Sequence, residues 1–164
     1  MLWINRGEII MHIANYLEPG TTEKLISELF KADNIEAFLK AHEGELVFPT
    51  FAAYITRLCK QKKLTIAKAL DKADIGTSFG YALFSGSRKP SRDTVIKLAV
   101  AFGLDLEDTQ KLLSAAGFGG LYPKIKRDAI IIYAIQRGYT IFQIQDELNQ
   151  HQMTELGAAD NDRR

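Results

Sequence analysis

The side chains of this sequence that are best placed for chemistry are two short groups of cations. Arg88, Lys89 and Arg92 lie within five residues of one another, and a second group lies within Lys60–Lys63. Guanidinium and ammonium groups donate charge-assisted hydrogen bonds to phosphate and carboxylate oxygens. Both groups can therefore contact an anionic ligand, although a charge run of this kind is also typical of a solvated turn.

A catalytic or metal-binding constellation is not recognisable. The three histidines, His12, His42 and His151, lie in the terminal regions, and none pairs with Cys59 or a carboxylate at a characteristic spacing. The sequence contains no P-loop and no GxGxxG motif. We therefore expect no enzyme activity, no cofactor and no metal ion, and we expect the histidines to be solvated.

The segment from Thr65 to Gly103 carries the Arg88 group, and its pattern predicts three short helices with tight joints. Ser, Thr and Asp are favoured at helix N-caps, and glycine is favoured just past a helix end. The three-residue joint between the first two helices contains Gly76, which we expect to take the tight turn. The predicted helices are Ile66–Ala73 after the cap Thr65, Thr77–Ser85 before Gly86, and a third from the cap Ser91 to Gly103.

Two short helices joined by a tight turn with glycine form a helix-turn-helix. The signature GxRKPS begins at Gly86, and the run LAxAxGL begins at Leu98. With these motifs, residues 50–116 resemble the XRE-type helix-turn-helix family, the group of Cro and the phage repressors. The resemblance implies an all-helical, five-helix core that binds double-stranded DNA in the major groove through Thr77–Ser85.

The resemblance also implies which residues read the bases. In the family these lie at the start of the recognition helix and about one turn further on, which carries the role to Gly76, Thr77, Ser78 and Ala82. Thr77 and Ser78 can form single hydrogen bonds or methyl contacts. None of the four positions holds Arg, Lys, Asn or Gln, so no bidentate base contact is expected.

Phosphate contacts are expected from the side chains around this helix. Tyr81 lies within it, and Arg88, Lys89 and Arg92 follow it, where they can meet the DNA backbone. Such contacts position a protein on DNA without specifying a sequence.

Gly80 departs from the family pattern, which usually buries a branched apolar residue there. Glycine inside a helix costs about 1 kcal/mol relative to alanine. We expect Gly80 to make room for Phe79, Phe84 or a neighbouring helix.

Residues 1–49 are predicted to form an acidic helical extension with a net charge of −4, whereas residues 50–116 carry +5. Its two short amphipathic helices need a partner surface to bury their apolar faces. The helices are expected from Thr21 or Thr22 to Phe30 and over Asn34–His42, the latter with a capping box of Asp33 and Glu36.

The remaining helices flank the motif. Thr50 is predicted to open a helix in which Cys59 is an apolar filler rather than a redox sensor, and Asp105 a helix through Ala116. Residues 117–150 are predicted to be a C-terminal helical extension and residues 151–164 a polar, frayed tail. In the extension, the helix over Lys124–Arg137 is apolar all round at Ala129–Ile135 and should be buried on several sides, and Thr140 caps the last helix.

The composition limits the class of protein that the chain can be. The chain has 164 residues, 46% of them hydrophobic, and a net charge of +1. A single cysteine fits a reducing compartment, and no run of 18 apolar residues predicts a membrane span, so we expect a cytoplasmic protein. Codons for Arg6–Glu8 could form a ribosome-binding site, which makes Met11 a candidate start. We find no internal repeat and no strand alternation.

These features predict a sequence-specific DNA-binding transcriptional regulator. The alternative is a helix-turn-helix scaffold used for protein contact, with little DNA affinity. We also expect a homodimer, because two-fold pairing would place two recognition helices about 34–36 Å apart, one turn of DNA. Its candidate surface is Ile130–Ile135, backed by Ile141, Ile144 and Leu148.

Overall fold

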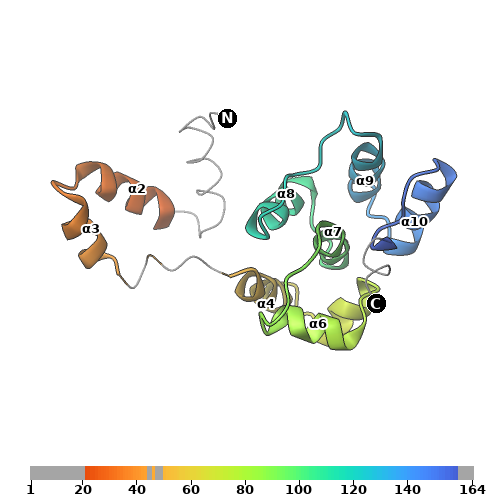
Figure 1. Ribbon diagram of the computed structural model, residues 1–164, viewed down its shortest axis with the longest axis horizontal. Helices are drawn as coiled ribbons and strands as arrows, with labels where there is room; N and C mark the ends of the chain where they lie inside the picture. Colours follow the sequence, from red (N-terminus) through yellow and green to blue (C-terminus); the bar gives the residue numbers. More distant parts are fainter. Residues whose placement is uncertain (1–20, 44–45, 47–49, 159–164) are drawn as a thin grey trace. The chain divides into compact units, whose positions relative to one another are not determined.

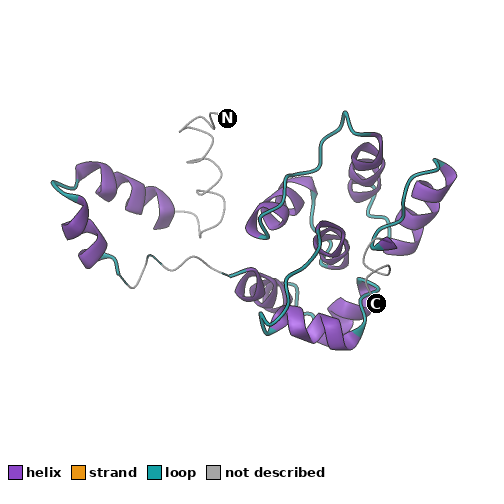
Figure 2. Cartoon of the chain, in the orientation of Figure 1, coloured by secondary structure: helices purple, strands orange, loops and turns teal. Residues whose placement is uncertain are grey.

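The structure, a computed structural model, describes residues 21–43, 46 and 50–158. All regular structure in these residues is helical (Figure 2), so the predicted all-α fold class is confirmed for them. The chain divides into two compact units, residues 1–49 and 50–164. Met11 and His12 lie outside the described residues. None of the described helices has the length and apolar character needed to cross a bilayer.

The first unit contains α2 (Thr21–Lys31) and α3 (Ile35–Ala41). The N-cap of α3 is Asn34, whose Oδ1 accepts the N–H of Ala37 at 2.8 Å. The predicted capping box beginning at Asp33 is therefore wrong by one residue, since Asn serves as well as Asp at this position. His42 is not solvated as expected, because its Nε2 lies 3.3 Å from Glu28 Oε2.

The second unit contains seven described helices, and local signals predicted their starts well. The predicted N-caps Thr50, Thr65, Ser91, Asp105 and Thr140 each accept a backbone N–H from the first turn. The helix expected from Lys124 begins two residues later. The helices are α4 (Phe51–Gln61), α5 (Ile66–Lys72), α6 (Thr77–Phe84), α7 (Arg92–Ala101), α8 (Leu106–Ala115), α9 (Lys126–Gln136) and α10 (Ile141–Gln150).

The α7 helix lies at the centre of this unit (Figure 1) and contacts α5, α8 and α10. Ile96 and Leu98 in α7 are fully buried. The surrounding helices bury apolar faces against α7, so α7 links α5 to the C-terminal helices.

The C-terminal segment after α10 is packed rather than frayed. Leu156 is only 2% exposed. The side-chain amide of Gln145 donates to the Leu156 carbonyl at 3.1 Å and accepts the Leu156 N–H at 2.8 Å. The prediction of a frayed polar tail is therefore wrong for residues 152–158.

An internal repeat, which we did not find in the sequence, emerges from the structure. The hairpins α7–α8 and α9–α10, each with the loop that follows, align without a gap at an offset of 35 residues. Over residues 92–122 and 127–157, eight of 31 positions are identical. The identical pairs are Arg92/Arg127, Asp93/Asp128, Ile96/Ile131, Ala99/Ala134, Gly103/Gly138, Gln110/Gln145, Leu113/Leu148 and Leu121/Leu156.

Equivalent side chains in the two repeats make equivalent contacts. Gln110 donates to the Leu121 carbonyl at 2.8 Å and accepts the Leu121 N–H at 2.7 Å, as Gln145 does with Leu156. Gly103 and Gly138 both end the first helix of their repeat in the left-handed region, at φ +62° and +67°. The repeat is thus one of structure as well as of sequence.

The two repeats are joined by two reciprocal ion pairs, which we call the double Arg–Asp clasp (Arg92, Asp93, Arg127, Asp128). Arg92 donates to both carboxylate oxygens of Asp128, at 3.1 and 2.9 Å. Arg127 donates to both oxygens of Asp93, at 2.9 and 2.8 Å. The arginine of each repeat binds the aspartate of the other, which is the contact pattern of a two-fold interface within one chain.

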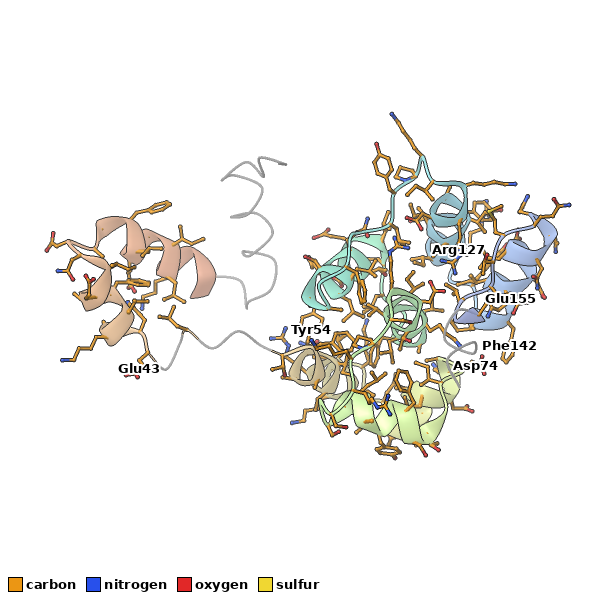
Figure 3. The ribbon with its side chains drawn as sticks, in the orientation of Figure 1. Glu43, Tyr54, Asp74, Arg127, Phe142 and Glu155 are labelled. Carbon is orange, nitrogen blue, oxygen red and sulfur yellow. The ribbon has the colours of Figure 1, made fainter. Side chains whose placement is uncertain are left out.

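The clasp also holds the loop that follows each hairpin. Arg92 donates to the carbonyls of Gly119 and Gly120 at 3.3 and 3.1 Å. Arg127 donates to those of Thr154 and Glu155 at 2.9 and 3.1 Å, and Figure 3 labels Arg127 and Glu155.

Each aspartate of the clasp in turn binds the loop of the other repeat. The backbone N–H of Tyr122 donates to Asp128, and that of Gly157 donates to Asp93, each at 3.0 Å. Neither loop can therefore leave without breaking charge-assisted hydrogen bonds.

The pKa of Asp93 is set by two opposing causes. Burial alone would raise the pKa of this carboxyl group, but hydrogen bonds from Arg127 and the Gly157 N–H stabilise the carboxylate and lower the pKa below its usual value. The pKa of Asp93 is lower in the folded state than in the unfolded state, where it is about 3.9. The ionised carboxylate therefore stabilises the folded state above pH 4. That contribution is lost as pH falls through the folded-state pKa.

We predict that Asp93→Asn lowers the free energy of unfolding at pH 7 by about 1.5–3 kcal/mol, the value of charge-assisted hydrogen bonds. The variant should also lose less stability than the parent between pH 5 and the acid limit of denaturation curves. Asp146→Asn is the matched control, because Asp146 is exposed on α10. Equal acid sensitivity in the parent and Asp93→Asn would contradict the assignment.

Candidate nucleic-acid interface

The turn between α5 and α6 differs from the prediction in its detail. Asp74 takes the left-handed conformation at φ +51°, whereas Gly76 has φ −58° and is the N-cap of α6. Aspartate is one of the few non-glycine residues that tolerate this region. The N–H of Ile75 closes the end of α5 on the Leu70 carbonyl at 3.0 Å. The expectation that Gly76 takes the tight turn is therefore wrong.

Lys97 of α7, which the sequence did not single out, holds this turn. Its Nζ donates to the Asp74 carbonyl at 2.8 Å and to the Asp74 carboxylate at 3.2 Å, and only 11% of the Lys97 side chain is exposed. Asp74 is labelled in Figure 3. Because this carbonyl belongs to the residue that reverses the chain, Lys97 fixes the path from α5 into α6.

Gly80 brings α6 close to α5. A Cβ atom at Gly80 would lie 2.8 Å from Leu70 Cγ and closer still to both Leu70 methyl groups. Leu70 is fully buried, so it has no solvent-filled space into which to move. The expected packing role of Gly80 is confirmed, and the neighbour is Leu70 rather than Phe79 or Phe84.

One side of α6 is exposed. Gly80, Leu83 and Phe84 are buried, and at 100° per residue Ser78 and Ala82 point to the opposite side. Thr77, Ser78 and Tyr81 are exposed and Ala82 is half-buried, and Gly76, also exposed, lies at the start of the helix. Ser78 and Ala82 thus lie on the outer side of α6, Tyr81 lies at the edge of that side, and Gly76 and Thr77 are accessible at the start of the helix.

Arg88 and Lys89 are exposed in a loop that folds back on the end of α6. The Ala82 carbonyl accepts hydrogen bonds from Ser85 Oγ, Ser87 Oγ and the Arg88 N–H, at 3.1, 3.2 and 3.1 Å. This network fixes the backbone at Arg88, so two cations lie beside the C-terminal end of α6, where the helix dipole also favours positive charge.

Arg92 does not join them. Its guanidinium group is occupied by Asp128 and by two carbonyls of the loop after α8. Asp128 is 2% exposed, so releasing Arg92 would leave a buried carboxylate without its partner. The prediction that Arg92 contacts phosphate is corrected: this side chain holds the two repeats together.

Further exposed cations lie on α4 and α5, the two helices that contact α6. Lys60, Lys62 and Lys63 lie at the end of α4, and Lys68, which the sequence analysis missed, is exposed on α5. The described ion pairs of this unit involve none of them and neither Arg88 nor Lys89. Lys68 could have been found from its position, since it lies opposite the apolar stripe of a short amphipathic helix.

The remaining candidate residues do not form a site. Cys59 is buried, and burial raises the pKa of its thiol, the opposite of what a reactive thiolate requires. His151 Nε2 lies 3.8 Å from Glu147, one helical turn away. Among the described residues, no three His, Cys, Asp or Glu side chains are grouped to hold a metal ion.

Comparison with known proteins adds no assignment, since no protein-family model, curated protein or solved structure matches the chain. The XRE-type assignment therefore stays a prediction.

We predict that Gly80→Ala lowers the free energy of unfolding by about 1–3 kcal/mol through overpacking against Leu70. This destabilisation should appear although alanine is favoured over glycine in a helix by about 1 kcal/mol. Chemical denaturation measures it, and Gly119→Ala is the control, because a Cβ atom at Gly119 would meet no atom within 4 Å.

A double-mutant cycle tests the cause. In a Leu70→Ala background the space is free, so Gly80→Ala should be neutral or stabilising. If Gly80→Ala costs the same in both backgrounds, the contact with Leu70 is not the reason for the glycine.

Proposed function

We propose that the chain is a DNA-binding transcriptional regulator, not an enzyme, and that α6 enters the major groove. The observation that carries the proposal is the exposed outer side of α6 with cations beside it. Arg88 and Lys89 follow the helix, and Lys68 lies on α5, which packs against α6. Among the described residues these cations have no acidic partner in an ion pair, and exposed cations can neutralise phosphates.

The balance of contacts favours the DNA backbone over the bases. The exposed residues of α6 carry the hydroxyl groups of Thr77, Ser78 and Tyr81, and the helix contains no guanidinium, ammonium or carboxamide group. Phosphate contacts then supply most of the affinity, and sequence discrimination by a single α6 helix is modest.

The alternative proposal is a protein-contact scaffold. Phe79 and Tyr81 are 37% and 50% exposed on α6, and exposed aromatic side chains are enriched at protein interfaces. A helix-turn-helix without DNA affinity could bind a protein through the same surface.

We predict that Arg88→Ala with Lys89→Ala weakens binding to all DNA sequences alike. The slope of log K against log salt should flatten by roughly 0.9 for each phosphate that the variant no longer neutralises. Binding of the labelled promoter region of its own gene, titrated with salt, measures both quantities.

The matched control is Lys124→Ala with Lys126→Ala. Lys126 begins α9 and Lys124 lies two residues before it, and α9 lies away from α6 in Figure 1. A change of sequence preference at unchanged slope in the Arg88/Lys89 variant would contradict the backbone role. Absence of any salt-dependent binding by the parent would favour the protein-contact scaffold.

We further propose that the protein is a homodimer, with a surface narrower than the sequence suggested. Ile141, Ile144 and Leu148 are buried within the unit, as are Ile131 and Ile135. None of these five side chains is free to contact a second copy. The segment Ala129–Ile135 was expected to be buried on several sides; Ile131, Ala134 and Ile135 are buried, and Tyr133 is exposed.

The internal repeat indicates which side of α9 is open. In α7, Thr94, Leu98 and Phe102 are buried. Their counterparts at the same offset are Ala129, Tyr133 and Arg137, of which Ala129 is half-buried and the other two are exposed.

These three residues, the α9 stripe, lie at helical spacing on one side. The Arg137 guanidinium lies 4.4 Å from the centre of the Tyr133 ring. Two such stripes could cover each other about a two-fold axis.

We predict a dimer mass by light scattering at micromolar concentration and a monomer mass for Tyr133→Glu, because the variant would bury a carboxylate in the interface. Phe142→Glu is the control, since Phe142 is exposed on α10, outside the α9 stripe. A monomer mass for the parent, both free and on DNA, would refute the dimer.

A further inference from the structure

The outer side of α6 has an unusual chemical content for a base-reading surface. Apart from the hydroxyl groups, the accessible residues of α6 carry the methyl groups of Thr77 and Ala82 and the ring of Phe79. Ala82 lies opposite the buried side, and Thr77 and Phe79 lie on the two opposite flanks of the helix. No other kind of polar group occurs along the helix, which is described in full. Any discrimination between bases must therefore use single hydrogen bonds or apolar contacts.

The major groove offers few apolar contacts. Guanine is read through two acceptors by Arg or Lys, and adenine through its donor and acceptor by Asn or Gln. Thymine alone presents a methyl group there, which Ala, Thr and Phe side chains contact. The three apolar groups at the surface of α6 belong to these three residue types.

We propose that α6 reads the C5 methyl groups of thymine, so that the DNA bound best has thymine where α6 enters the major groove. This inference rests on the proposed function. Charge complementarity supports DNA as the occupant, since Arg88 and Lys89 lie at one end of α6 and Lys68 on the adjoining α5.

The construction around α6 suits methyl recognition. Contacts of this kind are short-range and fall away within about an ångström of extra separation. Lys97 fixes the turn before α6. At the other end of the helix, the Ala82 carbonyl accepts three hydrogen bonds from the residues that follow. Because Gly80 has no side chain, α6 packs closely against Leu70. The small side chains are thus presented from a helix fixed at both ends.

The test compares duplexes that differ only in the methyl group. Fluorescence anisotropy measures binding of the whole chain to labelled alternating dA–dT and to alternating dA–dU, which lacks the C5 methyl. We expect weaker binding to dA–dU, by about fourfold for each methyl contacted. The reverse comparison, alternating dG–dC against the same duplex with 5-methylcytosine, should show tighter binding to the methylated form.

Variants assign the effect to α6. Thr77→Ser removes one methyl group and keeps the hydroxyl, so the dA–dT to dA–dU affinity ratio should fall by about fourfold if that methyl is in contact. Phe79→Leu and Ala82→Gly test the other two apolar groups in the same way. Thr65→Ser, the same change at the cap of α5, should leave the ratio unchanged.

The outcomes separate this inference from the proposed function. Salt-dependent binding with equal affinity for dA–dT and dA–dU would overturn methyl recognition and keep the DNA-binding proposal. No salt-dependent binding to any duplex would overturn both. A methyl preference that survives all three α6 variants would show that another surface reads the groove, and the inference would fail.

Discussion

The double Arg–Asp clasp is the interaction on which the second unit most depends. Four charged side chains form two bidentate pairs, and Asp128 is almost fully buried. Removing one partner of such a pair leaves an uncompensated charge, at a cost of about 3–5 kcal/mol when it is buried. The clasp also accepts hydrogen bonds from two loop N–H groups and donates to four loop carbonyls. It therefore specifies how the two repeats meet and how each of them ends.

The α7 helix transmits that constraint to α6. Its first turn carries Arg92 and Asp93, and Lys97 one turn later holds the left-handed Asp74. The backbone path from α5 into α6 is therefore tied to the same rigid helix that the C-terminal repeat clasps. The α10 helix packs against α9 and α7, and α7 in turn holds the turn between α5 and α6 through Lys97. The C-terminal helices therefore help to position α6 through their contacts with α7.

The sequence predicted what is decided within one helical turn. Five N-caps and most helix ends followed from Thr, Ser, Asp and Gly at the proper places, because a cap is a contact between residues three apart. The ion pair of Arg92 was not predicted, because its partner Asp128 lies 36 residues away in the sequence. A signal was present: the dipeptide Arg-Asp stands eleven residues before a glycine at both Gly103 and Gly138. Eight identities over 31 positions are too few to reveal a repeat from the sequence alone. The repeat becomes recognisable once the equivalent contacts of the identical residues are seen. The prediction of base-reading residues in α6 came from resemblance, and the structure adds only that these residues are accessible.

The differences between the two repeats are as informative as the identities. Lys97 in α7 corresponds to Ile132 in α9 at the same offset. A lysine is costly to bury unless its ammonium group is paired, and Lys97 is paired with the Asp74 carbonyl and carboxylate. The corresponding side chain in α9, Ile132, is apolar and half-buried. Likewise Leu98 is buried in α7, whereas its counterpart Tyr133 is exposed in α9. The same hairpin thus differs between its two copies: α7 holds the turn between α5 and α6 through Lys97, whereas α9 leaves Tyr133 exposed to solvent.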